Sequence, residues 1–301
     1  MSKILLNYFN TFAKKYRFAY LVHYTLMHLR RKYGLKNDNL LYESYDSYFD
    51  IVEEGHLVLR IPEFHGSFEM DFRSHILKRI LATKHYEPEL IEIIKDYVDP
   101  EKDVLDIGAN IGLFTVLFSK IISKKNKILS IEPTPHALKF LYNNIIRNDC
   151  KDSVIIFEGV AANTSGICQL KTITGMEEYS SLGNIVHPAV KDIIPKTINV
   201  KSDTIDNLVR NFNLNPGFIK IDVEGAEYSV LKGSINTLET HKPIIVSELS
   251  ELLLSSFEGN SKEILDFLKN IGYEVFNAND TNAIAKAPFE GEIIAIPSRF
   301  K

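Results

Sequence analysis

The chain has 301 residues, of which 45% are hydrophobic and 25% charged, and its formal net charge is −4. This composition is typical of a globular protein, and the length suits one large domain with an extension or two small domains. The two cysteines, Cys150 and Cys168, have no CxxC spacing, and the nine histidines have no paired metal-ligand spacing. These patterns exclude a disulfide framework and indicate no zinc site. Because no apolar segment ends in a small-residue cleavage site, we expect a cytoplasmic protein.

The N-terminal segment differs from the rest of the chain in charge. Residues 1–37 contain eight Lys and Arg and no Asp or Glu, with aromatic and aliphatic residues between them. A helix of this kind can lie on an anionic surface, so one interpretation is peripheral contact with the inner face of a membrane. The other, which we favour, is packing on the acidic remainder of the protein or on a second subunit of a homo-oligomer. The longest apolar stretch, Phe18–Leu29, is too short to span a bilayer.

The first third of the chain shows mixed patterns. Basic helices come first, and short alternating runs then predict strands at His56–Ile61 and Ser67–Phe72. A helical stretch follows, and we expect it to end in Pro88–Ile94. We therefore predict a helical extension with small strands over residues 1–80 and a second domain over residues 81–301.

From residue 103 onward, short β-branched runs alternate with turns and helical segments, which predicts βαβ units. The expected fold is α/β and Rossmann-like, with a mostly parallel seven-stranded sheet and helices on both faces. The stretch 163–203 interrupts the rhythm and is expected to form extra strands and a loop. The seven expected strands are Val104–Ile107, Ile128–Ile131, Val154–Phe157, Phe218–Ile221, Ile244–Val246, Tyr273–Phe276 and Glu292–Ile296.

The strongest motif is Val104–Gly112, a buried strand followed by a glycine-containing turn and an apolar helix. Gly108 lets the backbone turn sharply and approach a ligand, and the helix N-terminus behind it offers unpaired N–H groups. The pattern is not the GxGxxG of dinucleotide-binding proteins, because Asn110 stands where a second glycine would be. Asp106 on the strand would repel a diphosphate but suits a ligand with an ammonium group. The motif therefore favours S-adenosylmethionine over a dinucleotide.

An acid also ends the second strand of this unit. Glu132 closes the run Ile128–Glu132 and is followed by Pro133. In nucleotide-binding α/β folds, an acid at this position accepts the ribose hydroxyls. NAD-binding proteins share the feature, so it predicts a nucleoside site without choosing the cofactor.

A run of acids follows the fourth strand, Phe218–Ile221. Asp222 and Glu224 come directly after it, and Glu248 follows the next strand. Such side chains share the carboxyl edge of the sheet, where open α/β folds bind ligands. They could take a proton from an attacking hydroxyl or hold a divalent cation; we favour the first and assign no metal ligand. Glu227 is expected in the first turn of the next helix, where its charge suits the helix dipole.

In combination these motifs resemble the FkbM-type methyltransferases. The resemblance rests on Asp106–Gly112, on Glu132-Pro133 and on Lys220–Glu227. It does not extend to residues 1–80. Supporting pieces follow the family's order over residues 85–250, namely Tyr86-Glu87-Pro88, Ser180-Ser181-Leu182, Thr204-Ile205-Asp206, and Lys242-Pro243 followed by Glu248.

The resemblance implies a class I methyltransferase domain that uses S-adenosylmethionine to methylate a hydroxyl of a small molecule or glycan, with a sugar hydroxyl favoured. By position, Asp106, Gly108 and Asn110 would line the methionine end of the cofactor, and Glu132 would hold the ribose. The adenine would lie against Val160-Ala161-Ala162-Asn163. The catalytic carboxylates would be Asp222 and Glu224, facing the transferring methyl, and Glu248. The other residues assigned to cofactor binding are Glu87, Ala109, Gly112, Pro133, Ala161, Asn163 and again Asp222.

Two alternatives stay open. A non-catalytic module could keep the methyltransferase fold as a nucleoside-binding scaffold, and an NAD-dependent oxidoreductase could share the glycine turn and Glu132. The missing GxGxxG and the acids after the fourth strand disfavour the oxidoreductase. We expect no nucleic-acid partner, because the basic excess is confined to residues 1–37 and the remainder is acidic.

Overall fold

A computed structural model of the chain describes residues 55–187, 190 and 192–298. The basic segment 1–37, with both interpretations of it, lies outside these residues. Among the helices that the structure describes, none is long and apolar enough to cross a lipid bilayer.

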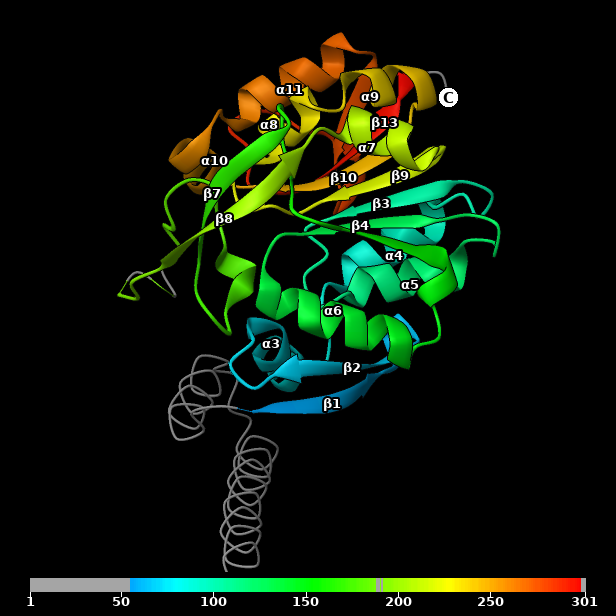
Figure 1. Cartoon of the computed structure of the whole chain (residues 1–301). Helices are drawn as coiled ribbons and strands as arrows, with labels where there is room; N and C mark the ends of the chain where they lie inside the picture. The colour runs from blue at the N-terminus through cyan, green and yellow to red at the C-terminus, as the bar shows by residue number, and fades with distance from the viewer. Residues whose placement is uncertain (1–54, 188–189, 191, 299–301) are drawn as a thin grey trace, which may run out of the picture.

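An eight-stranded sheet forms the centre of the molecule (Figure 1). Its strand order is β12-β11-β13-β10-β9-β3-β4-β5. The strands from β10 to β5 run parallel, and the antiparallel β13 lies between β10 and β11. The predicted α/β fold is confirmed, and all seven expected strands belong to this sheet: β3 (Asp103–Ile107), β4 (Ile128–Glu132), β5 (Val154–Glu158), β9 (Pro216–Ile221), β10 (Ile244–Leu249), β11 (Tyr273–Asn277) and β13 (Gly291–Pro297).

The eighth strand, β12 (Asp280–Ile284), was not expected from the sequence. It pairs antiparallel with β11 at the edge of the sheet, and its residues are mostly exposed. A polar edge strand lacks the alternation of apolar and polar residues that marks a half-buried strand, so periodicity gives no signal here.

Side chains of the central strands alternate between the two faces of the sheet. Val104 packs on one face and Leu105 on the other, and both are fully buried. Burial on this scale contributes roughly 1.5–3 kcal/mol per large aliphatic side chain. The face of Val104 is covered by α4 (Pro88–Tyr97), α5 (Leu113–Ile121) and α6 (Pro135–Arg147). The opposite face is covered by α7 (Ile205–Phe212), α8 (Glu227–Lys232), α9 (Ile235–His241) and α11 (Ser261–Asn270).

One helical segment differs from expectation, and the helical segment after β9 is divided in two. Pro88 begins α4, which continues to Tyr97, instead of lying inside a helix that ends with Ile94, because proline suits the first helical position, where its missing N–H has no partner to lose. The apolar positions between Ala226 and Leu238 fall on two short helices, α8 and α9, that are separated at Gly233. A Cβ at Gly233 would lie 2.1 Å from the carbonyl oxygen of Ala162, so this break lets the chain pass close to the loop at residues 162–165.

A β-hairpin extends the α6 side of the molecule. It consists of β1 (His56–Ile61), η1 (Pro62–Phe64) and β2 (Gly66–Asp71), and α3 (His75–Thr83) follows it. Phe64 is fully buried and packs edge-to-face on Phe114 of α5 with 5.2 Å between ring centroids. Asn144 of α6 accepts from the Glu69 amide at 2.7 Å and donates to the Glu69 carbonyl at 3.0 Å. The hairpin therefore shares its core with α5 and α6, while the division at residues 80 and 81 stays a prediction.

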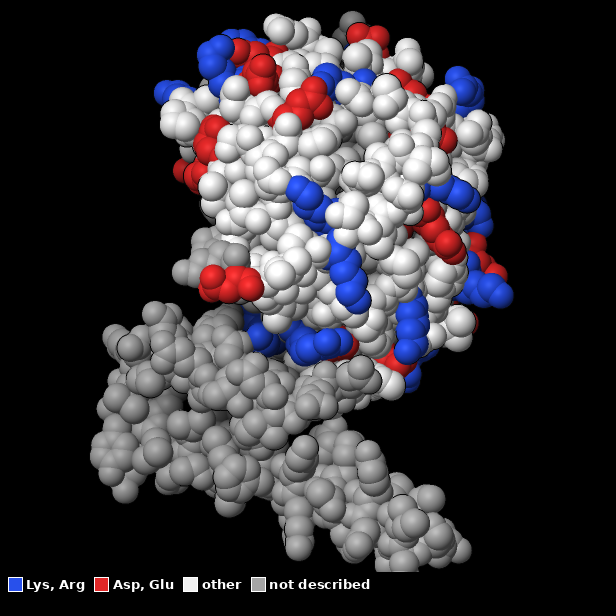
Figure 2. All heavy atoms as spheres, turned by 60° about the vertical axis from the view of Figure 1, so that its left-hand side comes forward, with Lys and Arg blue, Asp and Glu red and all other residues white. Residues whose placement is uncertain are grey.

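The stretch 163–203 forms extra strands and a loop, as predicted. β7 (Gly166–Thr172) and β8 (Lys196–Asp203) pair antiparallel, and β6 (Val160–Ala161) joins them in a three-stranded sheet. The loop between β7 and β8 contains η3 (Glu177–Tyr179), and its described residues 173–187 are here called the strap. Figure 2 shows this side of the molecule, where basic and acidic side chains are scattered among uncharged ones.

Candidate functional site

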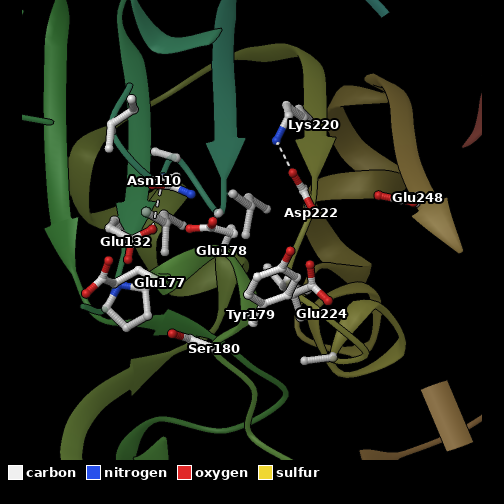
Figure 3. A pocket seen from close by; sticks show the side chains of 18 of the residues that line it. Asn110, Glu132, Glu177, Glu178, Tyr179, Ser180, Lys220, Asp222, Glu224 and Glu248 are labelled. Atoms are coloured by element: carbon white, nitrogen blue, oxygen red, sulfur yellow. Dashed lines mark hydrogen bonds and ion pairs between the residues drawn. The ribbon is translucent and has the colours of Figure 1, made fainter. Parts of the chain in front are cut away.

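A cavity of about 250 Å³ opens at the carboxyl edge of the sheet, where the strand order reverses between β3 and β9. Open α/β folds bind ligands in this crevice. One end of the cavity, the glycine-turn end, is lined by the β3–α5 turn, the end of β4 and residues 159–161. Figure 3 shows the other end, the carboxylate end, on the far side of Glu178 from Glu132; its polar lining is Arg79, Glu87, Lys220, Asp222, Glu224 and Glu248.

The glycine turn is wedged between two strands. The amides of Gly108 and Ala109 both donate to the Ile131 carbonyl on β4 at 3.0 Å. On the other side, a Cβ at Gly108 would lie 1.8 Å from the Asp222 carbonyl oxygen, and Gly108 has a φ of 79°. Only glycine combines this left-handed backbone with so close an approach. The turn therefore joins β4 to the first residue after β9.

Glu132 lies at the glycine-turn end as predicted, with 5% of its surface exposed. Its carboxylate accepts from the amides of Asn110 and Thr134 at 2.9 Å each and from the Thr134 hydroxyl at 2.5 Å. Burial outweighs these hydrogen bonds and raises the pKa of Glu132 to about 7. A carboxylate has about four lone-pair sites, so this group keeps acceptor capacity toward the cavity.

Asp106 does not line the cavity. On β3 it points to the same face as Val104, because side chains two residues apart on a strand share a face. There its Oδ2 accepts from the Thr115 hydroxyl of α5 at 2.5 Å, and its Oδ1 lies 3.9 Å from Lys220 Nζ. Asp106 is fully buried, and burial raises its pKa. The side chain that we expected beside a bound ammonium group lies beneath the cavity floor, against an ammonium of the protein.

Two other residues assigned to the cofactor also lie off the cavity wall. Gly112 precedes α5 with a φ of 87°, and a Cβ there would meet Leu141 at 2.6 Å. Asn163 donates its amide to the Ser229 hydroxyl at 3.2 Å, which ties the β6–β7 loop to α8. By contrast, the cavity wall includes seven of the residues assigned to cofactor binding, namely Glu87, Gly108, Ala109, Asn110, Pro133, Ala161 and Asp222, in addition to Glu132.

The carboxylate end gathers all three residues assigned to catalysis. Asp222 Oδ2 accepts from Lys220 Nζ at 3.0 Å. Burial, followed by the charges of Asp222 and Glu248, raises the pKa of Glu224 well above its ordinary value. Burial and Asp222 also raise the pKa of Glu248. Glu87 belongs to the same group, since burial and then Asp222 raise its pKa to about 7. Glu227 instead begins α8, as expected, and accepts from the Gly225 amide at 3.1 Å.

The strap closes one wall of the cavity, and no sequence pattern predicts the position of its side chains. Glu178 accepts from the His75 amide at the start of α3 at 2.6 Å, and burial raises its pKa to about 7. The Ser181 hydroxyl donates to the Glu224 carbonyl at 3.0 Å. The Tyr179 ring packs on the His187 ring in a tilted arrangement, with 4.6 Å between ring centroids. Ser180-Ser181-Leu182 marked this segment only through the family resemblance, while the lining by Glu177, Glu178 and Tyr179 follows from contacts with distant residues.

Three cavity residues adopt the left-handed backbone conformation without being glycine. They are Glu87, Asn110 and Glu224, with φ of 47°, 48° and 53°. Other positive-φ residues in the described chain, such as Lys84 and Asn213, end helices, where this conformation is common. Left-handed residues that cluster at a cavity store strain that the surrounding contacts maintain, and such clusters are typical of functional sites.

In the part of the chain that the structure describes, no three His, Cys, Asp or Glu side chains are arranged to hold a metal ion. The carboxylate end instead contains two basic side chains that are each paired with an acid. Lys220 pairs with Asp222, and Arg79 Nη1 lies 3.4 Å from Glu87 Oε1.

A glycine turn, a strand-end acid and a cavity at the switch point define a nucleoside-binding α/β domain. The FkbM methyltransferase domain model matches residues 106–275, more than half of the chain. The protein therefore belongs to the FkbM methyltransferase family.

The chain is similar to two characterised relatives. It is 26% identical over 165 residues to the hexuronic acid methyltransferase AglP of Haloferax volcanii, which covers 53% of this chain and 61% of that protein. It is 27% identical over 154 residues to the methyltransferase sdnD of Sordaria araneosa, which covers 43% of this chain and 59% of that protein. The matches thus span only about three fifths of either relative's length.

Among solved structures, the chain is similar to the methyltransferase FkbM from Methylobacillus flagellatus, with a TM-score of 0.45 and 16% identity over 73% of this chain and 52% of that one. It is also similar to an O-methyltransferase from Bacillus cereus, with a TM-score of 0.37 and 12% identity over 90% of this chain and 96% of that one. The family assignment rests on the match to residues 106–275.

Proposed function

We propose that the protein is an S-adenosylmethionine-dependent O-methyltransferase whose acceptor is a hydroxyl of a small molecule or glycan, with a sugar hydroxyl favoured. The observation that carries the proposal is the composition of one cavity. It joins the glycine turn and Glu132 at one end to Asp222, Glu224 and Glu248 at the other. A donor nucleoside and an acceptor hydroxyl could therefore meet at the ends of β3 and β9.

The residues present fit this cofactor. Glu132 is buried and keeps acceptor capacity toward the cavity, which suits a ribose hydroxyl. The excess of carboxylates in the cavity suits a cofactor that carries a sulfonium and an ammonium. When bound, the cofactor supplies an activated methyl group on a good leaving group. The protein then has to align the two partners and remove a proton from the acceptor.

Asp222 is the residue to which we assign proton removal. Its Oδ2 is held by Lys220, so Oδ1 is the oxygen left to accept the proton of an acceptor hydroxyl. Burial and the charge of Asp222 raise the pKa values of Glu224 and Glu248, which favours the protonated form of each carboxyl. A protonated carboxyl both donates and accepts, so these two groups can orient neighbouring hydroxyls of a polyol. The hexuronic acid named for the relative AglP supports a sugar acceptor.

A titration separates this function from a non-catalytic scaffold and from NAD chemistry. We expect S-adenosylhomocysteine to bind and NAD to give no heat by isothermal titration calorimetry. Glu132→Gln should weaken the binding by about 1.5–3 kcal/mol, the usual contribution of hydrogen bonds to a charged group. Glu158→Gln is the matched control, because Glu158 is the in-register neighbour of Glu132 on β5 but is exposed and bonds only the Tyr142 hydroxyl among described residues.

Methyl transfer is then measured with labelled S-adenosylmethionine and a panel of sugars and sugar polymers. Binding of S-adenosylhomocysteine without transfer to any acceptor in the panel would favour the scaffold. Equal affinity of the wild type and Glu132→Gln would refute the assignment of the ribose to Glu132.

A further inference from the structure

Lys220 is buried at the junction of the two ends of the cavity, and the proposed reaction assigns it no chemistry. It lies on β9, directly across from Asp106 on β3, and only 3% of its surface is exposed. Its side chain points to the α5 face, as Phe218 does two residues earlier. The position places a positive charge at the floor of the cavity.

This ammonium has two acidic neighbours of different kinds. Asp222 Oδ2 lies 3.0 Å from Nζ, and Asp106 Oδ1 lies 3.9 Å from it. The Phe114 ring covers a third side, with its centroid 5.0 Å from Nζ. The Asp106 side chain is sealed from solvent, whereas the Asp222 side chain is 36% exposed at the cavity. Lys220 therefore links a carboxylate that no ligand can reach to one that faces the ligand.

Asp106 cannot satisfy its own charge without this lysine. Its Oδ1 has no hydrogen-bond partner among the described residues, and its Oδ2 accepts only from the Thr115 hydroxyl, which is itself hydrogen-bonded to the Ser130 hydroxyl. An unpaired buried carboxylate is costly, so Asp106 holds the ammonium in place from below. The ammonium in turn holds Asp222 from the side and offsets part of its charge.

Asp222 borders the glycine turn directly. Its amide donates to the Ile107 carbonyl at 3.0 Å, and its carbonyl oxygen is the atom that a Cβ at Gly108 would strike. A ligand that reaches from the glycine turn to the carboxylate end passes this residue. The cofactor enters such a reaction as a cationic sulfonium and leaves as a neutral thioether, so the charge beside Asp222 favours one form over the other.

We propose that Lys220 is a positioning residue that limits how strongly the cavity prefers the sulfonium cofactor to its thioether product, by holding Asp222 and offsetting its charge. The inference rests on the proposed function. Without Lys220, the Asp222 carboxylate would bind the cation more tightly in the ground state, and tighter ground-state binding opposes the reaction. Asp106 is the anchor that keeps the lysine at this position.

The test is the ratio of two affinities, and it needs no acceptor. Dissociation constants for S-adenosylmethionine and S-adenosylhomocysteine are measured by calorimetry for the wild type, Lys220→Met, Asp222→Asn and the double variant. We expect Lys220→Met to raise the preference for S-adenosylmethionine on the order of tenfold, as for a unit charge a few ångströms away. Asp222→Asn should lower this preference, and the double variant should return close to the wild-type ratio.

Controls separate this role from a purely structural one. Lys95→Met removes the same charge from an exposed lysine on α4 that pairs with Glu92, and it should leave the ratio unchanged. Loss of packing alone would weaken the binding of both ligands equally and lower the melting temperature of the protein. The ratio of the two affinities would then stay unchanged. If Lys220→Met does not fold, Asp222→Asn is compared with the wild type, where loss of the carboxylate beside the retained ammonium must lower the ratio.

The outcomes of the two proposals are distinct. A wild-type protein that binds neither ligand would refute the proposed function. Binding of both ligands with the same ratio in all four proteins would refute the role of Lys220 and leave the function intact.

Discussion

The two ends of the cavity differ in how their carboxylates are held. At the glycine-turn end, Glu132 accepts hydrogen bonds from Asn110 and Thr134 at 2.5–2.9 Å. At the carboxylate end, the side chains of Glu224 and Glu248 have no hydrogen-bond partner among the described residues, and both have raised pKa values. The first end is organised before any ligand arrives. The second contains polar groups whose partners a ligand has to supply, so substitutions there should affect turnover more than folding.

The largest effect is expected at the glycine turn, where the backbone of Gly108 packs directly against the backbone of Asp222. Gly108→Ala combines a left-handed φ with a Cβ that collides with the Asp222 backbone, so we expect about 2–5 kcal/mol of destabilisation and loss of S-adenosylhomocysteine binding. Gly272→Ala is the control, because its φ is 87° but nothing lies within 4 Å of its Cβ position. That variant should lose only about 1–2 kcal/mol and keep the binding. Chemical denaturation measures the stability of each variant, and calorimetry measures its binding of S-adenosylhomocysteine. Equal destabilisation of the two variants would contradict a close contact between Gly108 and the Asp222 backbone.

A second effect should appear in turnover alone. Asp222→Asn keeps the side-chain size and removes the charge, so S-adenosylhomocysteine should still bind while the methyl-transfer rate falls at least about 100-fold, as for a lost general base. Glu248→Gln, at the same end of the cavity, should reduce the rate less, because Glu248 lies one strand further from the glycine turn than Asp222, whose amide donates to the Ile107 carbonyl. Initial rates with an acceptor found in the sugar panel measure both. A fully active Asp222→Asn would transfer the base role to Glu224 or Glu248.

The difference between the two ends also separates what the sequence could predict from what it could not. The glycine turn, Glu132 and Asp222 follow strands with strong local patterns, so their place at one sheet edge could be predicted. The direction of Asp106 could have been found as well, because strand alternation places it on the face of Val104. The predicted ligand contact rested on the acidic side chain, its place before the glycine turn and the family resemblance, none of which specifies the face of the strand.

Other features depend on contacts between distant parts of the chain. The strap reaches the cavity because Glu178 binds the His75 amide and Ser181 binds the Glu224 carbonyl. Neither pair is close in sequence, and the strap has no periodic pattern that fixes its position. Lys220 was visible only as part of a motif, and its role between Asp106 and Asp222 required the register of β3 against β9.

The smallest expected effect is a dependence of cofactor binding on pH at the organised end. Burial raises the pKa of Glu132 from the ordinary 4.5 to about 7. The folded protein without ligand therefore binds more protons than the unfolded chain between these values, so its stability should fall as the pH rises from 4.5 to 7. Ribose hydroxyls that donate to Glu132 would favour the ionised form, and S-adenosylhomocysteine should then bind about tenfold more weakly at pH 6 than at pH 8.

A matched variant isolates Glu132 from the other acids that titrate in the same range. Burial also raises the pKa values of Glu87 and Glu178, which line the cavity, to about 7 each, so the wild-type profile alone does not identify the group. The Glu132→Gln variant has no ionisable group at this position. Its affinity for S-adenosylhomocysteine should therefore vary less with pH than the affinity of the wild type. Calorimetry at pH 6, 7 and 8 gives both profiles, and their difference reports Glu132 alone. Parallel profiles would mean that the pH dependence arises at the carboxylate end, and that the bound ligand does not donate hydrogen bonds to Glu132.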